Sequence, residues 1–156
     1  MLSSLKAHYS KPKRYYHGFE HILELIEHFH HVDHQGPGWN RPKEVFCAIL
    51  YHDAIYEYGA QDNEEKSAVL AMKELPHWLP NTPLDLEWIS RLIRLTAKHG
   101  QLDRETVNAE EALFLDCDMA IMAASWERFQ RYEKQIEEEY THIYAKSLYQ
   151  MGRRRF

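Results

Sequence analysis

VFCAILYHDA, residues 45–54, decides how this chain of 156 residues folds and where its chemistry lies. An apolar run from Val45 leads into His52 and Asp53, and helix-forming residues resume at Ala54. Burying an imidazole beside a carboxylate costs free energy unless both groups are paired or bound to something. A divalent metal ion satisfies both groups at once. A hydrogen-bonded His–Asp pair in the core is the simpler interpretation, so the rest of the chain has to decide between them.

The composition predicts one globular domain with a full hydrophobic core, since 44% of the residues are hydrophobic. The net charge is −5, from 19 basic and 24 acidic residues. This balance argues against a nucleic-acid polymer or an anionic membrane as partner. Cys47 and Cys117 lie in apolar stretches outside any C-x-x-C pair. With no signal-peptide pattern and no membrane-length apolar run, we expect reduced thiols and a cytoplasmic protein.

The apolar periodicity is helical almost throughout, and no segment has the period of a strand. We therefore predict an all-α bundle of six or seven helices in one domain, residues 1–156. The Asp62-x-x-Glu65 and Asn108-x-x-Glu111 segments are typical of capping boxes, and Pro42 suits a first helical turn. The expected helices cover roughly residues 1–8, 15–34, 41–58, 62–75, 82–99, 108–124 and 125–152.

Two of these helices carry further polar groups at the margin of the core. In the helix predicted from residue 15, a narrow stripe contains His17, His21, Glu24 and His28 beside an apolar face. Such a stripe fits a ligand pocket, although histidines at a core margin are often structural.

The helix expected over residues 108–124 contains two aspartates in an apolar sequence, Asp116 and Asp118. Aspartate is unfavourable inside a helix and is rarely buried unpaired. The two residues lie about 200° apart around a regular helix, so they do not both face one ion. Asp118 has the more apolar neighbours, and we expect it to face a cation. Together, the three helices offer nitrogen and oxygen ligands suited to Mn, Fe, Co, Ni or Zn more than to Ca.

The order of these groups resembles the HD superfamily of metal-dependent phosphohydrolases, specifically a little-characterised subgroup of predicted HD-type phosphohydrolases. The resemblance covers about residues 12–155. It rests on six segments, Arg14-Tyr15-Tyr16-His17-x-x-x-His21, His52-Asp53-Ala54-Ile55-Tyr56, Asp62-Asn63-Glu64-x-x-Ser67-Ala68, Thr96-Ala97-Lys98-His99, Phe114-Leu115-Asp116-Cys117-Asp118 and Glu139-Tyr140.

The resemblance implies four metal ligands, His21, His52, Asp53 and Asp118. It implies one divalent ion (Mn, Fe, Co, Ni, Zn or Mg) and a polarised water that attacks phosphorus, with Asp53 part of the catalytic machinery. The substrate would be a small phosphorylated metabolite, most simply a nucleotide. The substrate-binding candidates are Arg14, His17, His99 and Lys66, and Arg14 is favoured because a guanidinium grips phosphate oxygens bidentately.

One departure from the family concerns the residues after the His-Asp motif. Relatives that hydrolyse stringent-response nucleotides have Glu-Asp at the positions of Tyr56 and Glu57. With one carboxylate left there, that particular activity is not expected, and Glu57 or Glu64 becomes the candidate general acid/base. Either could equally be a solvated helix residue.

The sequence is compatible with a homodimer. It is also compatible with two other functions. His17-x-x-Glu20-His21 satisfies the inverted zinc-peptidase signature, in which both histidines bind zinc and Glu20 is the base. That interpretation leaves His52, Asp53 and Asp118 unexplained. Alternatively, the chain is a metal-containing, non-catalytic ligand-binding or regulatory module of the HD type.

Overall fold

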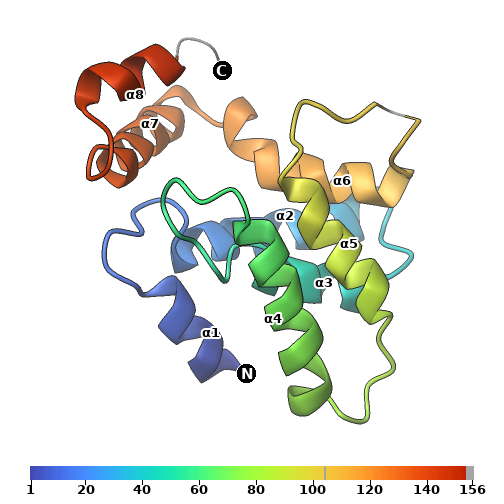
Figure 1. Ribbon diagram of the computed structural model, residues 1–156. Helices are drawn as coiled ribbons and strands as arrows, with labels where there is room; N and C mark the ends of the chain where they lie inside the picture. Colours follow the sequence, from blue (N-terminus) through green and yellow to red (C-terminus); the bar gives the residue numbers. More distant parts are fainter. Residues whose placement is uncertain (104, 154–156) are drawn as a thin grey trace.

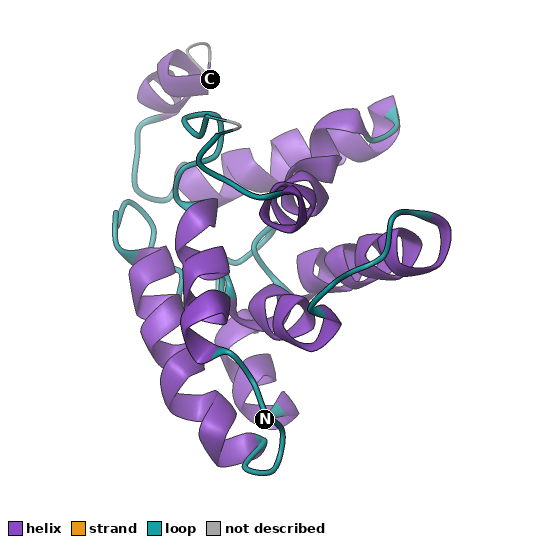
Figure 2. Ribbon diagram, turned by 90° about the vertical axis from the view of Figure 1, so that its right-hand side faces the viewer, coloured by secondary structure: helices purple, strands orange, loops and turns teal. Residues whose placement is uncertain are grey.

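Helices account for all the regular secondary structure in the computed structural model, which describes residues 1–103 and 105–153 (Figures 1 and 2). The elements are α1 (Leu2–Tyr9), α2 (Phe19–Gln35), α3 (Pro42–Tyr51), α4 (Asn63–Trp78), α5 (Leu86–Thr96), α6 (Ala109–Asp118), the 3₁₀ helix η1 (Met119–Ala123), α7 (Trp126–Tyr140) and α8 (Lys146–Arg153). The predicted all-α, single-domain class is confirmed. The expected final helix is divided into α7 and α8.

Helix α3 is the centre of the main core. It packs against α2, α4 and α5, and α4 and α5 also pack against each other. Val45, Ala48, Ile49 and Tyr51 are fully excluded from solvent, as the apolar run predicts. An element buried on nearly all sides needs apolar residues all round, so the sequence of α3 and its position agree.

The C-terminal helices form a separate hydrophobic cluster. α7 and α8 lie together at the end of the molecule far from α1, drawn orange to red in Figure 1. Their cluster buries Tyr16, Ile121, Tyr132 and Ile136, with partly buried aromatic rings around them. Tyr16 precedes α2, so this cluster joins the C-terminal helices to the start of α2.

Local capping follows the sequence in part. Asn108 and Glu111 form the predicted capping box, with both reciprocal hydrogen bonds present. The box predicted at Asp62 is wrong, because the Asp62 carboxylate pairs with Lys66 and Glu65 pairs with Arg94. Salt bridges to neighbouring basic residues thus take both side chains away from the helix start.

Within the described residues, the helices include none that is both long and apolar enough to cross a bilayer.

Candidate metal centre

His21 lies in the first turn of α2 and is buried. The predicted helix start near residue 15 is wrong, because the backbone N–H groups of Tyr16 and His17 donate to the Glu139 carboxylate instead of entering a helix. His17 therefore precedes α2. Of the predicted stripe, only His21 reaches the core; Glu24 pairs with Arg128, and His28 is exposed.

His52 and Asp53 directly follow the last turn of α3. The predicted continuation of this helix to residue 58 is wrong. Side chains of α4 bind the backbone after the motif: Ser67 bonds the N–H and carbonyl of Ile55, and Asn63 bonds those of Glu57. The His-Asp pair is thus placed at a helix end, where backbone carbonyls lack partners within the helix.

Asp118 ends α6, and its side chain is 11% exposed, whereas Asp116 on the same helix is exposed. The structure therefore places Asp118 beside the histidines and turns Asp116 to solvent. The two residues lie on different sides of the helix, as their spacing in the sequence requires.

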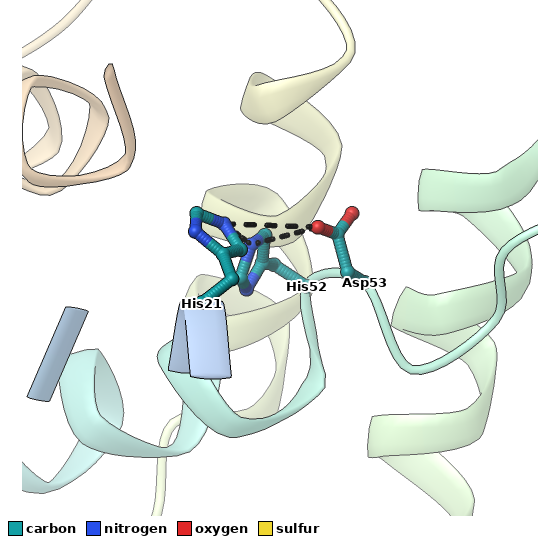
Figure 3. Close-up of side chains that lie close together, drawn as sticks. All are labelled: His21, His52 and Asp53. Carbon is teal, nitrogen blue, oxygen red and sulfur yellow. Dashed lines mark hydrogen bonds and ion pairs between the residues drawn. The ribbon is translucent and has the colours of Figure 1, made fainter. Parts of the chain in front are cut away.

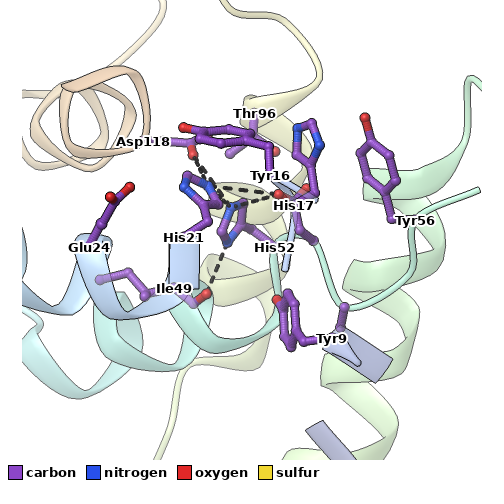
Figure 4. Close-up of polar contacts among 12 residues, drawn as sticks. Tyr9, Tyr16, His17, His21, Glu24, Ile49, His52, Tyr56, Thr96 and Asp118 are labelled. Carbon is purple, nitrogen blue, oxygen red and sulfur yellow. Dashed lines mark hydrogen bonds and ion pairs between the residues drawn. The ribbon is translucent and has the colours of Figure 1, made fainter. Parts of the chain in front are cut away.

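The four predicted ligands form one cluster of side chains. Figure 3 shows His21, His52 and Asp53, and Figure 4 shows Asp118 beside the two histidines. Ligand atoms of His21, His52 and Asp53 all lie within 4.8 Å of one another. Nε2 of His52 is 3.3 Å from Nε2 of His21, 3.2 Å from Oδ2 of Asp53 and 3.4 Å from Oδ1 of Asp118. Nε2 of His21 is 3.0 Å from the same Asp118 oxygen. Nε2 of each histidine thus lies within 3.9 Å of an oxygen of Asp53 and of an oxygen of Asp118.

The orientation of the His52 ring determines which of its nitrogens can bind a cation. Its Nδ1 lies 2.9 Å from the carbonyl oxygen of Ile49, which only accepts hydrogen bonds, so Nδ1 carries a proton. In the neutral imidazole, Nε2 then presents a lone pair to two carboxylates and a second imidazole. A hydrogen bond from the other ring nitrogen to a backbone carbonyl is the usual arrangement of a metal-binding histidine.

The charges of the cluster are strongly coupled. Burial disfavours the imidazolium of His52, but the carboxylates of Asp53 and Asp118 outweigh burial and hold the pKa of His52 well above its ordinary value. Burial likewise opposes ionisation of Asp118, yet contacts with His52, His21 and His99 hold its pKa well below the ordinary value. The cluster therefore requires a positive charge, which is supplied either by protons on the histidines or by a bound cation.

His99 lies beyond the end of α5 and contacts the outer oxygen of Asp118. Its Nε2 is 2.8 Å from Oδ2, while Oδ1 of the same carboxylate faces His21 and His52. The helix ends at Thr96, earlier than predicted. His99 is thereby placed at the edge of the cluster, where it fixes the orientation of Asp118.

His17 belongs to a second His–carboxylate pair. Its Nδ1 is 2.7 Å from Oε2 of Glu139, a fully buried residue of α7. Oε1 of the same carboxylate accepts from the N–H groups of Tyr16 and His17 at 2.7 and 2.9 Å. On its face, the His17 ring stacks on Tyr56 with 4.1 Å between centroids. These contacts fix the His17 ring beside the cluster.

Arg14 contacts the backbone of the His-Asp segment. Its Nη2 donates to the backbone carbonyl of Asp53 at 2.6 Å, and its guanidinium lies over the rings of Tyr9 and Tyr56. Its Nε and Nη1 are shielded from solvent and have no hydrogen-bond partner among the described residues. Arg14 thus holds the His-Asp segment in place, and its contact with phosphate stays a prediction.

Glu57, Glu64 and Lys66, the remaining predicted catalytic and phosphate-binding residues, belong to other sets of contacts. Glu57 is exposed and pairs with Lys66 at 2.9 Å, and Lys66 also pairs with Asp62. Glu64 lines a charged surface cavity between α4 and α5. Within the described residues, no hydrogen bond or ion pair joins these side chains to His21, His52, Asp53 or Asp118.

The zinc-peptidase geometry is not formed. It requires His17 and His21 one turn apart on a helix, whereas His17 precedes α2. Glu139 engages Nδ1 of His17, the rings of the two histidines are inclined at 75°, and Glu20 is exposed.

Glu139 is the site residue that the sequence reasoning missed as a functional side chain. The sequence does contain a sign of its burial, because Glu139 lies at helical spacing from the apolar residues Tyr132 and Ile136, which are buried in α7.

No family model, curated protein or solved structure matches this chain. The candidate centre therefore rests on its own geometry.

Proposed function

We propose that this protein is a metal-dependent phosphohydrolase that acts on a small phosphorylated metabolite. One divalent cation would be held by His21, His52, Asp53 and Asp118. The observation that carries the proposal is the Nε2 atom of His52, which faces two carboxylates and another imidazole while its Nδ1 is engaged by a backbone carbonyl. A transition-metal ion satisfies all four groups together.

The charge of the cluster supports a cation-dependent reaction on phosphate. When the histidines are neutral and no cation is bound, the carboxylates of Asp53 and Asp118 keep an uncompensated negative charge that would repel a phosphate group. When bound, a divalent ion offsets this charge, polarises phosphoryl oxygens and lowers the pKa of a bound water. His17 and His99 at the border of the cluster would then be the candidates to contact phosphate oxygens or move a proton.

A metal-binding module without turnover is the second candidate. It is favoured by the positions of Glu57 and Glu64, because neither predicted acid/base contacts the cluster. In that case the same four ligands would hold the ion, and phosphorylated compounds would bind without being cleaved.

The decisive test is elemental analysis after incubation with Mn, Co, Ni or Zn and removal of excess metal. Exposed histidines on α2, such as the stacked His30 and His34, can also collect metal, so we would use a His30→Ala/His34→Ala background. We expect about one ion per chain in this background and loss of that ion in His52→Ala. Hydrolysis of phosphomonoesters by the loaded protein would support the phosphohydrolase. Retained metal without turnover would favour the binding module, and absence of metal would refute both.

A further inference from the structure

A cavity of about 440 Å³ lies between α7 and α8, which is within the range of small-molecule sites. Its wall is aromatic and apolar: Tyr132, Tyr140, Tyr144 and Tyr149 line it together with Ile136 and Leu148. The ring of Tyr140 lies 6.4 Å from that of Tyr144 and 6.3 Å from that of Tyr149, inclined by 16° and 28°. Nearly parallel ring faces of this kind favour a flat ligand.

The cavity adjoins the candidate metal centre through His17. His17 lines it, and the ring of His17 is 6.3 Å from that of His21. A second chain of ring contacts runs from Tyr132 to Tyr16 at 4.6 Å and from Tyr16 to His21 at 4.8 Å. Figure 4 shows His17 and Tyr16 on the same side of the cluster. A ligand whose reacting group reaches the cluster past His17 therefore has its remaining part in this cavity.

The wall also contains a polar group that lacks a partner. The hydroxyl of Tyr149 is buried and makes no hydrogen bond within the part of the chain that the structure describes. Leaving a buried hydroxyl unpaired costs free energy, so a shift of the Tyr149 ring that exposes this hydroxyl to a polar ligand atom would be favourable. The cavity thus offers stacking surfaces for an aromatic ring, and one residue of its wall has an unsatisfied hydroxyl.

We propose that this cavity, which we call the tyrosine cavity, binds a planar aromatic ring that forms the non-reacting part of the ligand. As a subsite of the substrate, this inference rests on the proposed phosphohydrolase. The ring would be a nucleobase or a simple aryl group, and both offer the same stacking face. His17, held by Glu139, borders the cavity on the side of the cluster and separates the ring from the reacting group.

The test is a titration of metal-free protein with adenosine, phenol and ribose, followed by calorimetry. These probes carry no phosphate, so their binding does not depend on the metal centre. Adenosine or phenol should bind more tightly than ribose, and the comparison of the two distinguishes a nucleobase site from an aryl site. If neither ring compound binds more tightly than ribose, the inference is wrong.

Tyr144→Ala is the variant of choice because Tyr144 is 40% exposed and its loss should leave the fold intact. We expect about a tenfold loss of affinity, in line with the loss of one stacking side chain, and recovery of affinity in Tyr144→Phe. Tyr15→Ala is the matched control: Tyr15 is 41% exposed and lies outside the cavity. Equal effects of Tyr144→Ala and Tyr15→Ala would overturn the assignment.

The two proposals fail in different ways. Ring binding by a protein that takes up no metal would retain the tyrosine cavity and refute the phosphohydrolase. A loaded protein that cleaves ribose 5-phosphate and adenosine 5′-monophosphate equally well, and binds no ring compound, would retain the phosphohydrolase and refute the aromatic subsite.

Discussion

Two buried histidine–carboxylate groups lie side by side in this protein, and they differ in how completely they are satisfied. In the pair of His17 and Glu139, both carboxylate oxygens accept hydrogen bonds, one from the imidazole and the other from two backbone N–H groups. In the cluster around His52, by contrast, the Nε2 atoms of two histidines each lie 3.0–3.9 Å from oxygens of two carboxylates.

The difference separates a structural pair from a candidate ion site. Donors and acceptors alternate around Glu139, so the pair is complete as it stands. Around His52, acceptors face acceptors unless protons or a cation lie between them. The identity of the residues does not make this distinction, since both groups consist of histidines and carboxylates. The number of donors does.

The largest contrast is expected from removing a carboxylate of the cluster. Asp118→Ala should weaken metal binding by about 100-fold or more, since even loss of an outer partner costs about 10–100-fold. Asp116→Ala is the matched control, because that side chain is exposed on the same helix. Competition with a fluorescent chelator would measure both affinities. Loss of metal in Asp116→Ala, with retention in Asp118→Ala, would mean that the wrong aspartate has been assigned.

Disruption of the His17–Glu139 pair should lower the stability of the protein and leave its metal binding unchanged. Glu139→Ala leaves His17 and two N–H groups without their acceptor, and breaking a buried pair costs about 3–5 kcal/mol. The melting temperature should fall on the order of 10 °C, equally with chelator and with saturating metal. Glu138→Ala, in the partly exposed neighbouring position, should change it little. A loss seen only with metal would place Glu139 in the ion site.

The sequence contains most of the fold and the cluster because these depend on local rules. A His-Asp pair after an apolar run, and Asp118 in another, are polar groups that burial would penalise without partners. Helical periodicity likewise predicts the all-α class. The end of α3 is not readable in this way, since it depends on Asn63 and Ser67 of another helix.

Glu139 and Arg14 show where local reasoning ends. Glu139 binds residues more than 120 positions away, so its partners lie outside any sequence window. Arg14 has the chemistry of a phosphate ligand, yet the fold directs Nη2 to the carbonyl of Asp53. In both cases the residue type predicts what the side chain can bind, and only the tertiary structure selects the partner.

Rising pH should have opposite effects on the two groups: the stabilisation from His17 in the His17–Glu139 pair should decrease, and the metal affinity of the His52 cluster should increase. Burial alone would lower the pKa of His17, but the bond to Glu139 raises it, and the same bond lowers that of Glu139 against burial. The stabilisation from His17 is therefore complete below its ordinary pKa of 6.5 and lost as the pH rises through the raised value. That from Glu139 is complete above 4.5 and lost as the pH falls through the lowered value.

The metal affinity should instead increase with pH, because His52, whose pKa is raised, must lose its Nε2 proton to bind an ion. Urea unfolding of the metal-saturated protein and of Glu139→Gln across the pH range would measure the first effect, with about 1.4 kcal/mol per unit of pKa shift. Chelator competition at each pH would measure the second. Parallel pH profiles of stability and metal affinity would contradict the separation of the two groups.

The smallest effect is expected at Arg14, which contacts the cluster around His52 only through the backbone carbonyl of Asp53. Arg14→Lys keeps the charge but loses the planar group that reaches the Asp53 carbonyl between two tyrosine rings. Loss of this charged hydrogen bond should cost about 1.5–3 kcal/mol of stability. If Arg14 positions Asp53, metal affinity falls and KM for a phosphorylated substrate changes little once metal is saturating. If Arg14 instead grips phosphate, the order reverses: metal affinity is retained and KM rises. The variant thus shows whether the guanidinium of Arg14 binds the protein backbone or the substrate.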